Sequence, residues 1–158
     1  FIERETYPLL LKKHFPIAVY KSDAYWKDIG TIEKYIQAHR DILNGICPFP
    51  EFKSENQGIF IGENTIIHPS SKIIGPVYIG KNTNIGANTT IGPNTIIGNN
   101  CEIGENNKII NSIVWDKINI QENCAFSGII HNSNFMIFSS CINTKTIQTH
   151  VYNKNMAL

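Results

Sequence analysis

The sequence predicts a mainly β protein built around a parallel β-helix, and three observations support this fold class. Isoleucine recurs nine times in succession at intervals of six residues, from Ile61 to Ile109. A small residue stands four places after most of these isoleucines. Asparagine commonly stands three places after them, and glycine one place after them. Self-similarity at a short fixed period is typical of a solenoid, in which each repeat packs on its neighbours.

Each column of the repeat has a physical role. A β-branched isoleucine on a short strand points inward and stacks on its equivalent in the next coil, about 4.8 Å away. The small residue fits a narrower second inward position, and asparagine and glycine form corners because both tolerate left-handed or strained backbone. If three six-residue sides make one coil, the inward stacks are Ile61, Ile79 and Ile97, then Ile67, Ile85 and Ile103, then Ile73, Ile91 and Ile109.

The regular repeat does not cover the whole chain. Hexads this strict resemble those of known hexapeptide-repeat proteins, which implies a left-handed, triangular coil. After Ile109 the register breaks, and residues 110–116 are predicted to form a looser turn before the hexads resume at Ile120. Residues 126–137 read as irregular further strands, and residues 143–158 as a frayed tail.

The first 46 residues share none of the hexads. They predict a short helix over residues 8–14 and short strands over residues 17–20 and 24–28. A longer helix is expected to begin after an N-cap at Thr31 and to stop at Gly45. Its apolar face would comprise Ile32, Ile36, His39 and Leu43. A segment this short buries too little surface for a core of its own, so it either packs on the solenoid or ends a larger domain.

Composition excludes several classes of function. The 14 basic and 13 acidic residues give a net charge of +1, and no basic stripe offers a footprint for nucleic acid. No apolar run approaches the length of a membrane span, and no leader opens the chain. The four cysteines show no metal-binding spacing and are expected to be reduced thiols. These observations predict a cytoplasmic protein without nucleic acid or membrane partners.

Several segments carry a resemblance to a known family. Within the first 46 residues they are Phe1-Ile2-Glu3, Tyr7-Pro8-Leu9-Leu10, Tyr25-Trp26-Lys27-Asp28-Ile29-Gly30-Thr31-Ile32-Glu33-Lys34-Tyr35 and Ala38-His39-Arg40-Asp41-Ile42-Leu43. Within the solenoid they are Ile73-Ile74-Gly75-Pro76-Val77-Tyr78-Ile79-Gly80 and Asn111-Ser112-Ile113-Val114-Trp115-Asp116. Together they resemble the end of a sugar-phosphate nucleotidyltransferase domain and the β-helix that follows it, in particular those of mannose-1-phosphate guanylyltransferases.

The resemblance implies a division of the chain. Residues 1–46 would be the C-terminal remnant of a nucleotidyltransferase domain, residues 47–59 a linker, residues 60–142 the left-handed β-helix and residues 143–158 a tail. The glycine-rich nucleotide loop of the family is absent from these 158 residues. The chain also begins within a helical pattern, so we expect it to be a fragment of a longer enzyme and inactive alone.

Asp28 is the one residue that the resemblance assigns to chemistry. In the family the aspartate of the W-x-D-x-G block helps to hold Mg²⁺, so Asp28 is expected to bind that ion in the parent enzyme. In this fragment alone it would instead cap the turn before the helix. Trp26 is expected to pack in a core, Lys27 to be a solvated surface lysine, and Gly30 to give the turn its backbone freedom.

The function implied by the resemblance is the formation of an NDP-sugar from an NTP and a sugar 1-phosphate, with GTP and mannose 1-phosphate as the first choice. The solenoid would serve as scaffold and as a contact between subunits of a homo-oligomer. A hexapeptide acyltransferase that uses acetyl-CoA is the alternative, and it would need a histidine base. His131 is the better candidate for that base, and His68 stands at a corner and is expected to point outward.

Overall fold

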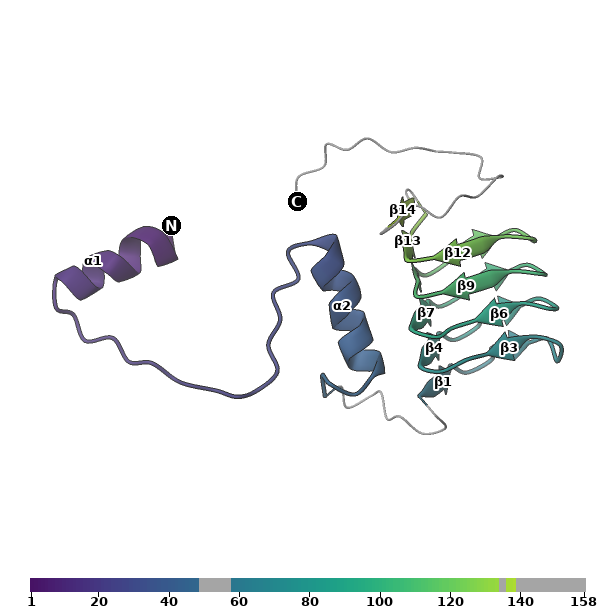
Figure 1. The fold of residues 1–158 in the computed structure, drawn as a ribbon, viewed down its shortest axis with the longest axis horizontal. Helices are drawn as coiled ribbons and strands as arrows, with labels where there is room; N and C mark the ends of the chain where they lie inside the picture. The colour runs from purple at the N-terminus through teal and green to yellow at the C-terminus, as the bar shows by residue number, and fades with distance from the viewer. Residues whose placement is uncertain (49–57, 134–135, 139–158) are drawn as a thin grey trace.

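The protein winds into a parallel β-helix with a helix beside it (Figure 1). The computed structural model describes residues 1–48, 58–133 and 136–138. The predicted tail, residues 143–158, and most of the predicted linker lie outside these residues, and the predicted domain boundaries stay predictions. No helix in the described part is long and apolar enough to cross a membrane.

The strands form three sheets, one for each side of the coil. The first sheet contains β1 (Ile59–Ile61), β4 (Val77–Ile79), β7 (Thr95–Ile97), β10 (Ile113–Val114), β13 (Ile129–His131) and β14 (Met136–Phe138). The second contains β2 (Ile66–Ile67), β5 (Asn84–Ile85), β8 (Glu102–Ile103) and β11 (Asn119–Ile120). The third contains β3 (Lys72–Ile73), β6 (Thr90–Ile91), β9 (Lys108–Ile110) and β12 (Ala125–Ser127). The pairing is parallel throughout, except that β14 runs antiparallel to β13.

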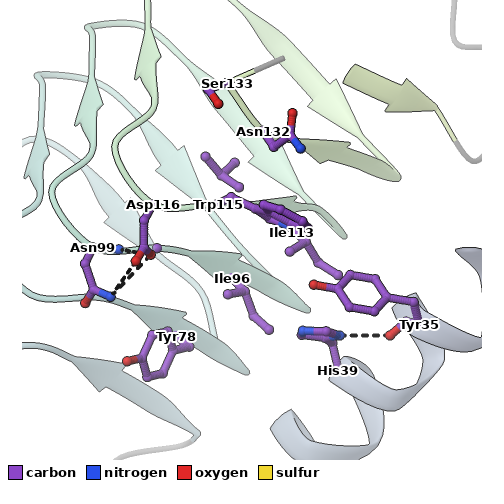
Figure 2. A pocket seen from close by; sticks show the side chains of 12 residues that line it. Tyr35, His39, Tyr78, Ile96, Asn99, Ile113, Trp115, Asp116, Asn132 and Ser133 are labelled. Carbon is purple, nitrogen blue, oxygen red and sulfur yellow. Dashed lines mark hydrogen bonds between the residues drawn. The ribbon is translucent and has the colours of Figure 1, made fainter. Parts of the chain in front are cut away.

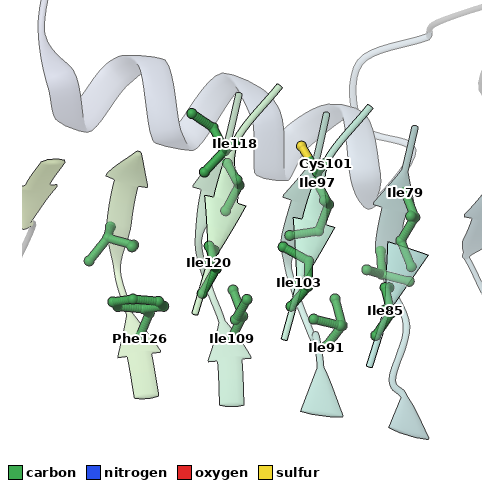
Figure 3. Packing of buried hydrophobic residues seen from close by; sticks show 13 residues of the cluster. Ile79, Ile85, Ile91, Ile97, Cys101, Ile103, Ile109, Ile118, Ile120 and Phe126 are labelled. Carbon is green, nitrogen blue, oxygen red and sulfur yellow. The ribbon is translucent and has the colours of Figure 1, made fainter. Parts of the chain in front are cut away.

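The three predicted isoleucine stacks are confirmed. Ile61 pairs with Ile79, which pairs with Ile97 on the first sheet. The stacks of the second and third sheets follow the same predicted order. From Ile79 onward, the buried isoleucines of the three stacks form one apolar cluster along the axis of the coil (Figure 3). Ile67 and Ile73 of the first coil pack against this cluster, whereas Ile61 is 45% exposed.

The second inward column explains why threonine recurs in it. Thr83 is fully buried, and its hydroxyl donates to the carbonyl of Gly98 at 2.9 Å and accepts from the backbone N–H of Cys101 at 3.1 Å. Asn107 makes equivalent bonds with its side-chain amide, including one from Nδ2 to the carbonyl of Gln121 at 2.8 Å. A small polar side chain therefore pairs backbone groups that would otherwise be buried without a partner.

The corners confirm the expectation for asparagine and correct the one for glycine. The corner asparagines adopt left-handed backbone, for example Asn82 with φ 53°. In contrast, Gly80 and Gly98 are not left-handed. They are small because the next coil passes close by: a Cβ added at Gly80 would lie 2.6 Å from the carbonyl carbon of Gly98. Among the glycines of the hexads, Gly92 alone has a positive φ, of 93°.

The looser turn predicted for residues 110–116 is wrong. Ile113 and Val114 form β10, which pairs with Ile96 and Ile97 of β7. Val114 follows Ile109 by one residue fewer than a hexad requires, so one side of the coil is shorter and the stack continues. The β-helix therefore accommodates the break in the repeat, and its core continues without interruption.

The longer predicted helix is confirmed as α2 (Ile32–Leu43). Thr31 caps it, since its side chain accepts from the backbone N–H of Lys34, and Gly45 follows it with φ 72°. Ile36 is buried against Ile113 and Ile130 on the outer face of the first sheet. Of the first 46 residues, α2 thus packs on the solenoid, which was one of the two alternatives.

The two strands predicted for residues 17–20 and 24–28 are wrong. Residues 13–31 contain no helix or strand, and no described strand pairs with them. Most of their apolar side chains are exposed, at 92% for Tyr20 and 82% for Trp26. An extended segment becomes a strand only where a neighbour takes up its backbone hydrogen bonds. Core packing of Trp26 is therefore also wrong.

Before this segment, the chain forms two short helices. These are η1 (Ile2–Thr6), a π-helix, and α1 (Tyr7–Lys12), which includes much of the short helix predicted for residues 8–14. Neither contains a buried residue, and Figure 1 shows both well away from the solenoid.

Candidate functional site

Asp28 lies in the loop that leads into α2, and its carboxylate is occupied by neighbours. Oδ1 accepts from the backbone N–H of Gly30 at 3.1 Å, and Oδ2 pairs with Lys34 Nζ at 2.7 Å. The hydrogen bond from Lys34, followed by that from Gly30, lowers the pKa of Asp28 below its ordinary value. Asp28 therefore caps the turn, as expected for the fragment alone.

Gly30 contributes to the same turn in another way than expected. Its backbone is outside the left-handed region, and an added Cβ would lie 3.3 Å from Asp28 Oδ1. Among the described residues, no group of three His, Cys, Asp or Glu side chains could hold a metal ion. The Mg²⁺ role of Asp28 stays a prediction.

A buried carboxylate stands behind this turn, on α2. Asp41 is 4% exposed and accepts three hydrogen bonds from side chains. Tyr25 donates its hydroxyl at 2.7 Å, Gln37 donates Nε2 at 2.8 Å, and Lys27 donates Nζ in an ion pair. We call these four residues the Asp41 hub. The expectation that Lys27 is a solvated surface lysine is wrong, because its side chain is only 26% exposed and is paired.

The hub was missed by the sequence interpretation, although part of its signal is visible. Gln37 and Asp41 are four residues apart and so share one face of a helix. Tyr25 and Lys27 alternate, as residues on one side of an extended segment do. Nothing in the sequence says that these two pairs meet, since contact between them depends on how the loop returns to the helix.

The hub shifts the pKa values of two of its members in opposite directions. Hydrogen bonds from Lys27, Gln37 and Tyr25 lower the pKa of Asp41 from 3.8 to about 2. Burial, followed by the hydrogen bond to Asp41, raises the pKa of Tyr25 from 10.0 to about 12. The hub therefore holds a carboxylate and a neutral phenol at neutral pH.

These shifts predict how the hub depends on pH. The stabilisation due to Asp41 is fully present above pH 3.8 and is lost as pH falls through about 2. The stabilisation due to the Tyr25 hydroxyl is present below pH 10.0 and is lost as pH rises through about 12. Titration of the Asp41 carboxyl carbon by NMR should give a midpoint near 2. A midpoint at or above the ordinary value of 3.8 would contradict the hub.

A groove of about 410 Å³ runs between α2 and the first sheet (Figure 2). Tyr35 and His39 line it from α2, and Ile96 and Ile113 line it from the sheet. Asp116 closes one end, where its Oδ1 accepts from the backbone N–H of Asn99 at 2.7 Å. No lysine or arginine is among the residues that line the groove, so it offers no side-chain cation for a nucleotide phosphate.

Neither of the two histidines considered for acyl transfer is among the residues that line this groove. His68 is exposed, as expected, and its Nδ1 contacts Ser70 Oγ at 2.8 Å. His131 is half-buried at the end of β13, where Nδ1 lies 2.9 Å from the carbonyl of Asn132. Burial lowers the pKa of His131.

Comparison with known proteins supports one family. Residues 73–150 match a family model described as the GMPPB C-terminal domain. The chain is 28% identical over 85 residues to a mannose-1-phosphate guanylyltransferase of Mycobacterium tuberculosis. The aligned region covers 53% of this chain and 24% of that protein. The chain is also 32% identical over 87 residues to a glucose-1-phosphate adenylyltransferase of Clostridium novyi. That aligned region covers 49% of this chain and 22% of that protein.

The chain thus matches about a quarter or less of the length of these curated relatives. The matched part of the chain includes most of the β-helix, where the family model begins at β3. The predicted resemblance is confirmed: the β-helix of this chain is related to the C-terminal part of sugar-phosphate nucleotidyltransferases.

Proposed function

We propose that the intact protein to which this chain belongs is a sugar-1-phosphate nucleotidyltransferase. In this reaction a phosphate oxygen of the sugar 1-phosphate attacks the α-phosphate of an NTP. The bond to the β-phosphate breaks, and pyrophosphate leaves with its electron pair. We propose GTP and mannose 1-phosphate as the substrates, because a mannose-1-phosphate guanylyltransferase is among the relatives. The cytoplasm stays the predicted location.

The observation that carries the proposal for this chain is the exposure of its N-terminal apolar side chains. These include Phe1, Ile2, Leu9, Leu11, Phe15, Val19, Tyr20, Trp26 and Ile29, each at least half exposed. Apolar side chains in such number favour burial against another surface. A nucleotidyltransferase domain of the same protein would supply that surface, and this chain would be its C-terminal edge, its joint and its scaffold.

Asp28 is suited to act only within such a larger site. Negative charge accumulates between the attacking oxygen and the departing pyrophosphate, and a divalent ion neutralises it. Mg²⁺ commonly takes one or two carboxylates and completes its octahedron with phosphate oxygens and water. Lys34 would have to release the Asp28 carboxylate, and an exposed ion pair of this kind costs little to break.

The test is carried out on the intact protein. Incubation with GTP, mannose 1-phosphate and Mg²⁺ should release pyrophosphate and form GDP-mannose, whereas this chain alone should form none. Asp28→Asn should lower kcat by roughly 10²–10³-fold, because a preorganised charge is lost at the reacting phosphates. The melting temperature should stay near that of the parent, because Asp28 is half exposed.

Asp23→Asn is the matched control, since Asp23 is an exposed aspartate five residues earlier. It should leave kcat unchanged. An equal kcat in Asp28→Asn and Asp23→Asn would remove Asp28 from the proposal. No product with GTP, ATP, UTP or dTTP and either mannose or glucose 1-phosphate would contradict the proposed function itself.

Two further expectations have different support. Assembly into a homo-oligomer stays a proposal, and it is supported by the first coil, where Ile61 is 45% and Ile66 is 66% exposed. Exposed apolar residues at an open end favour pairing or capping. The acyltransferase alternative is not favoured, because the relatives are nucleotidyltransferases.

A further inference from the structure

The segment that carries Asp28 has two faces, although it is not a strand. Tyr25 and Lys27 turn toward α2 and reach Asp41. Trp26 is 82% exposed and the Asp28 side chain is 54% exposed. Alternation of this kind places Tyr25 and Lys27 against the helix and leaves Trp26 available to a further surface. The Asp28 carboxylate is half exposed and pairs with Lys34 at the start of α2.

Asp41 is the buried point at which this segment is held on α2, and the exposed pair of Asp28 with Lys34 is a second contact. An ionised carboxylate that is nearly buried is costly unless it is paired and hydrogen-bonded. Asp41 meets that condition through three donors, two of which belong to the segment and one to α2. Within the described residues around it, these are the side chains that hydrogen-bond to its carboxylate.

The helix is in turn fixed to the solenoid. Ile36 packs with Ile113 and Ile130, and Ile32 and Tyr35 lie against the same cluster. At the other end of α2, Asn44 Nδ2 donates to Asn94 Oδ1 at 3.3 Å, across to a corner of the β-helix. The position of α2 is therefore set by the first sheet, and the position of residues 25–28 is set by α2.

We propose that Asp41 is a positioning residue, which holds residues 25–28 on α2 and so fixes the carboxylate of Asp28 relative to the β-helix. The inference rests on the proposed function only for its consequence in catalysis. The physical claim, that the hub orders the segment, concerns this chain alone. Asp41 itself would touch neither substrate nor metal.

The first experiment measures order in this chain by ¹⁵N relaxation. In the unchanged chain, residues 25–28 should show backbone order parameters near the roughly 0.85 of rigid backbone. Asp41→Asn removes the charge that holds Lys27, and the order parameters should fall below about 0.6. Those of α2 and of the β-helix should not change. Asp23→Asn, which makes the same chemical change outside the hub, should leave all of them unaltered.

A second variant covers the possibility that Asp41→Asn fails to fold. Tyr25→Phe deletes one hydroxyl from the hub and leaves the ion pair with Lys27 intact. It should lower the order parameters of residues 25–28 by a smaller amount. If Asp41→Asn folds and its order parameters for residues 25–28 are unchanged, the proposal is overturned. If only Tyr25→Phe folds, unchanged order parameters in that variant overturn it.

The second experiment uses the intact protein and separates positioning from stability. Asp41→Asn should lower kcat by up to about 100-fold, the effect expected of a small misplacement in a reacting site. It should also raise the Mg²⁺ concentration that gives half-maximal rate, a change that loss of stability alone does not produce. If Asp41→Asn loosens residues 25–28 but leaves kcat and the Mg²⁺ dependence of the rate unchanged, the proposed effect on catalysis is overturned. Absence of any product from the unchanged protein would instead contradict the proposed function, and the relaxation data would still decide the hub.

Discussion

Replacing Gly80 with alanine is expected to force apart the second and third coils of the β-helix. The added Cβ would lie 2.6 Å from the carbonyl carbon of Gly98 and 2.7 Å from the backbone nitrogen of Asn99. Both are backbone atoms, so relief requires the coils to separate. That movement also weakens the hydrogen bond from Gly80 N–H to the carbonyl of Ile97, which is 2.8 Å long. We expect a loss of about 3 kcal/mol, at the upper end of overpacking costs.

The control is the neighbouring residue. Lys81 is exposed, and Lys81→Ala introduces the same side chain one position later. It should change stability by less than about 0.5 kcal/mol. Urea unfolding monitored by circular dichroism gives both values from the transition midpoints. Equal midpoints for the two variants would show that the coils at Gly80 and Gly98 do not approach each other this closely.

Replacing Ile91 with alanine is expected to leave a cavity in the centre of the solenoid. Ile91 is fully buried in the apolar cluster (Figure 3). It stacks between Ile73 and Ile109 on the third sheet. The paired backbones on both sides limit collapse into the vacated space. The cost should be about 2–5 kcal/mol, as for other large-to-small changes in cores.

Thr90 provides the matched comparison, because it belongs to the same two-residue strand and faces the opposite way. Thr90→Ala should lower the free energy of unfolding by less than about 0.5 kcal/mol. Thermal unfolding of the two variants checks this difference. A larger loss for Thr90→Ala than for Ile91→Ala would mean that the inward and outward columns are exchanged.

The β-helix could be predicted because its information is local and repeated. Each hexad specifies the same strand, the same inward residue and the same corner, so the pattern is counted many times along the chain. The left-handed corner of Asn82 and the stack from Ile61 to Ile97 follow from residue type and spacing. The close approach at Gly80 does not follow, because it depends on the distance between coils rather than on the conformation of one residue.

The sequence contains a signal for the position of α2, but the five-residue step before Val114 concealed it. On the first sheet the outward column contains Phe60, Tyr78, Ile96, Ile113 and Ile130, and these residues are paired along the stack. An apolar outward column predicts a covering element, whereas Lys72, Thr90 and Lys108 on the third sheet predict solvent. Because the side before Val114 is one residue short, a strict count of six loses the column at Ile113.

The sequence by itself determined the repeat, the inward stacks, the helix after Thr31 and the resemblance to sugar-phosphate nucleotidyltransferases. Only the tertiary structure decided that α2 covers the first sheet, and that Tyr25 and Lys27 meet on Asp41. The physical reason is that a periodic pattern fixes contacts between equivalent positions of successive coils. Contacts between a loop and a helix have no period. The contacts of Tyr25 and Lys27 with the buried carboxylate of Asp41 depend on how the loop folds back onto α2.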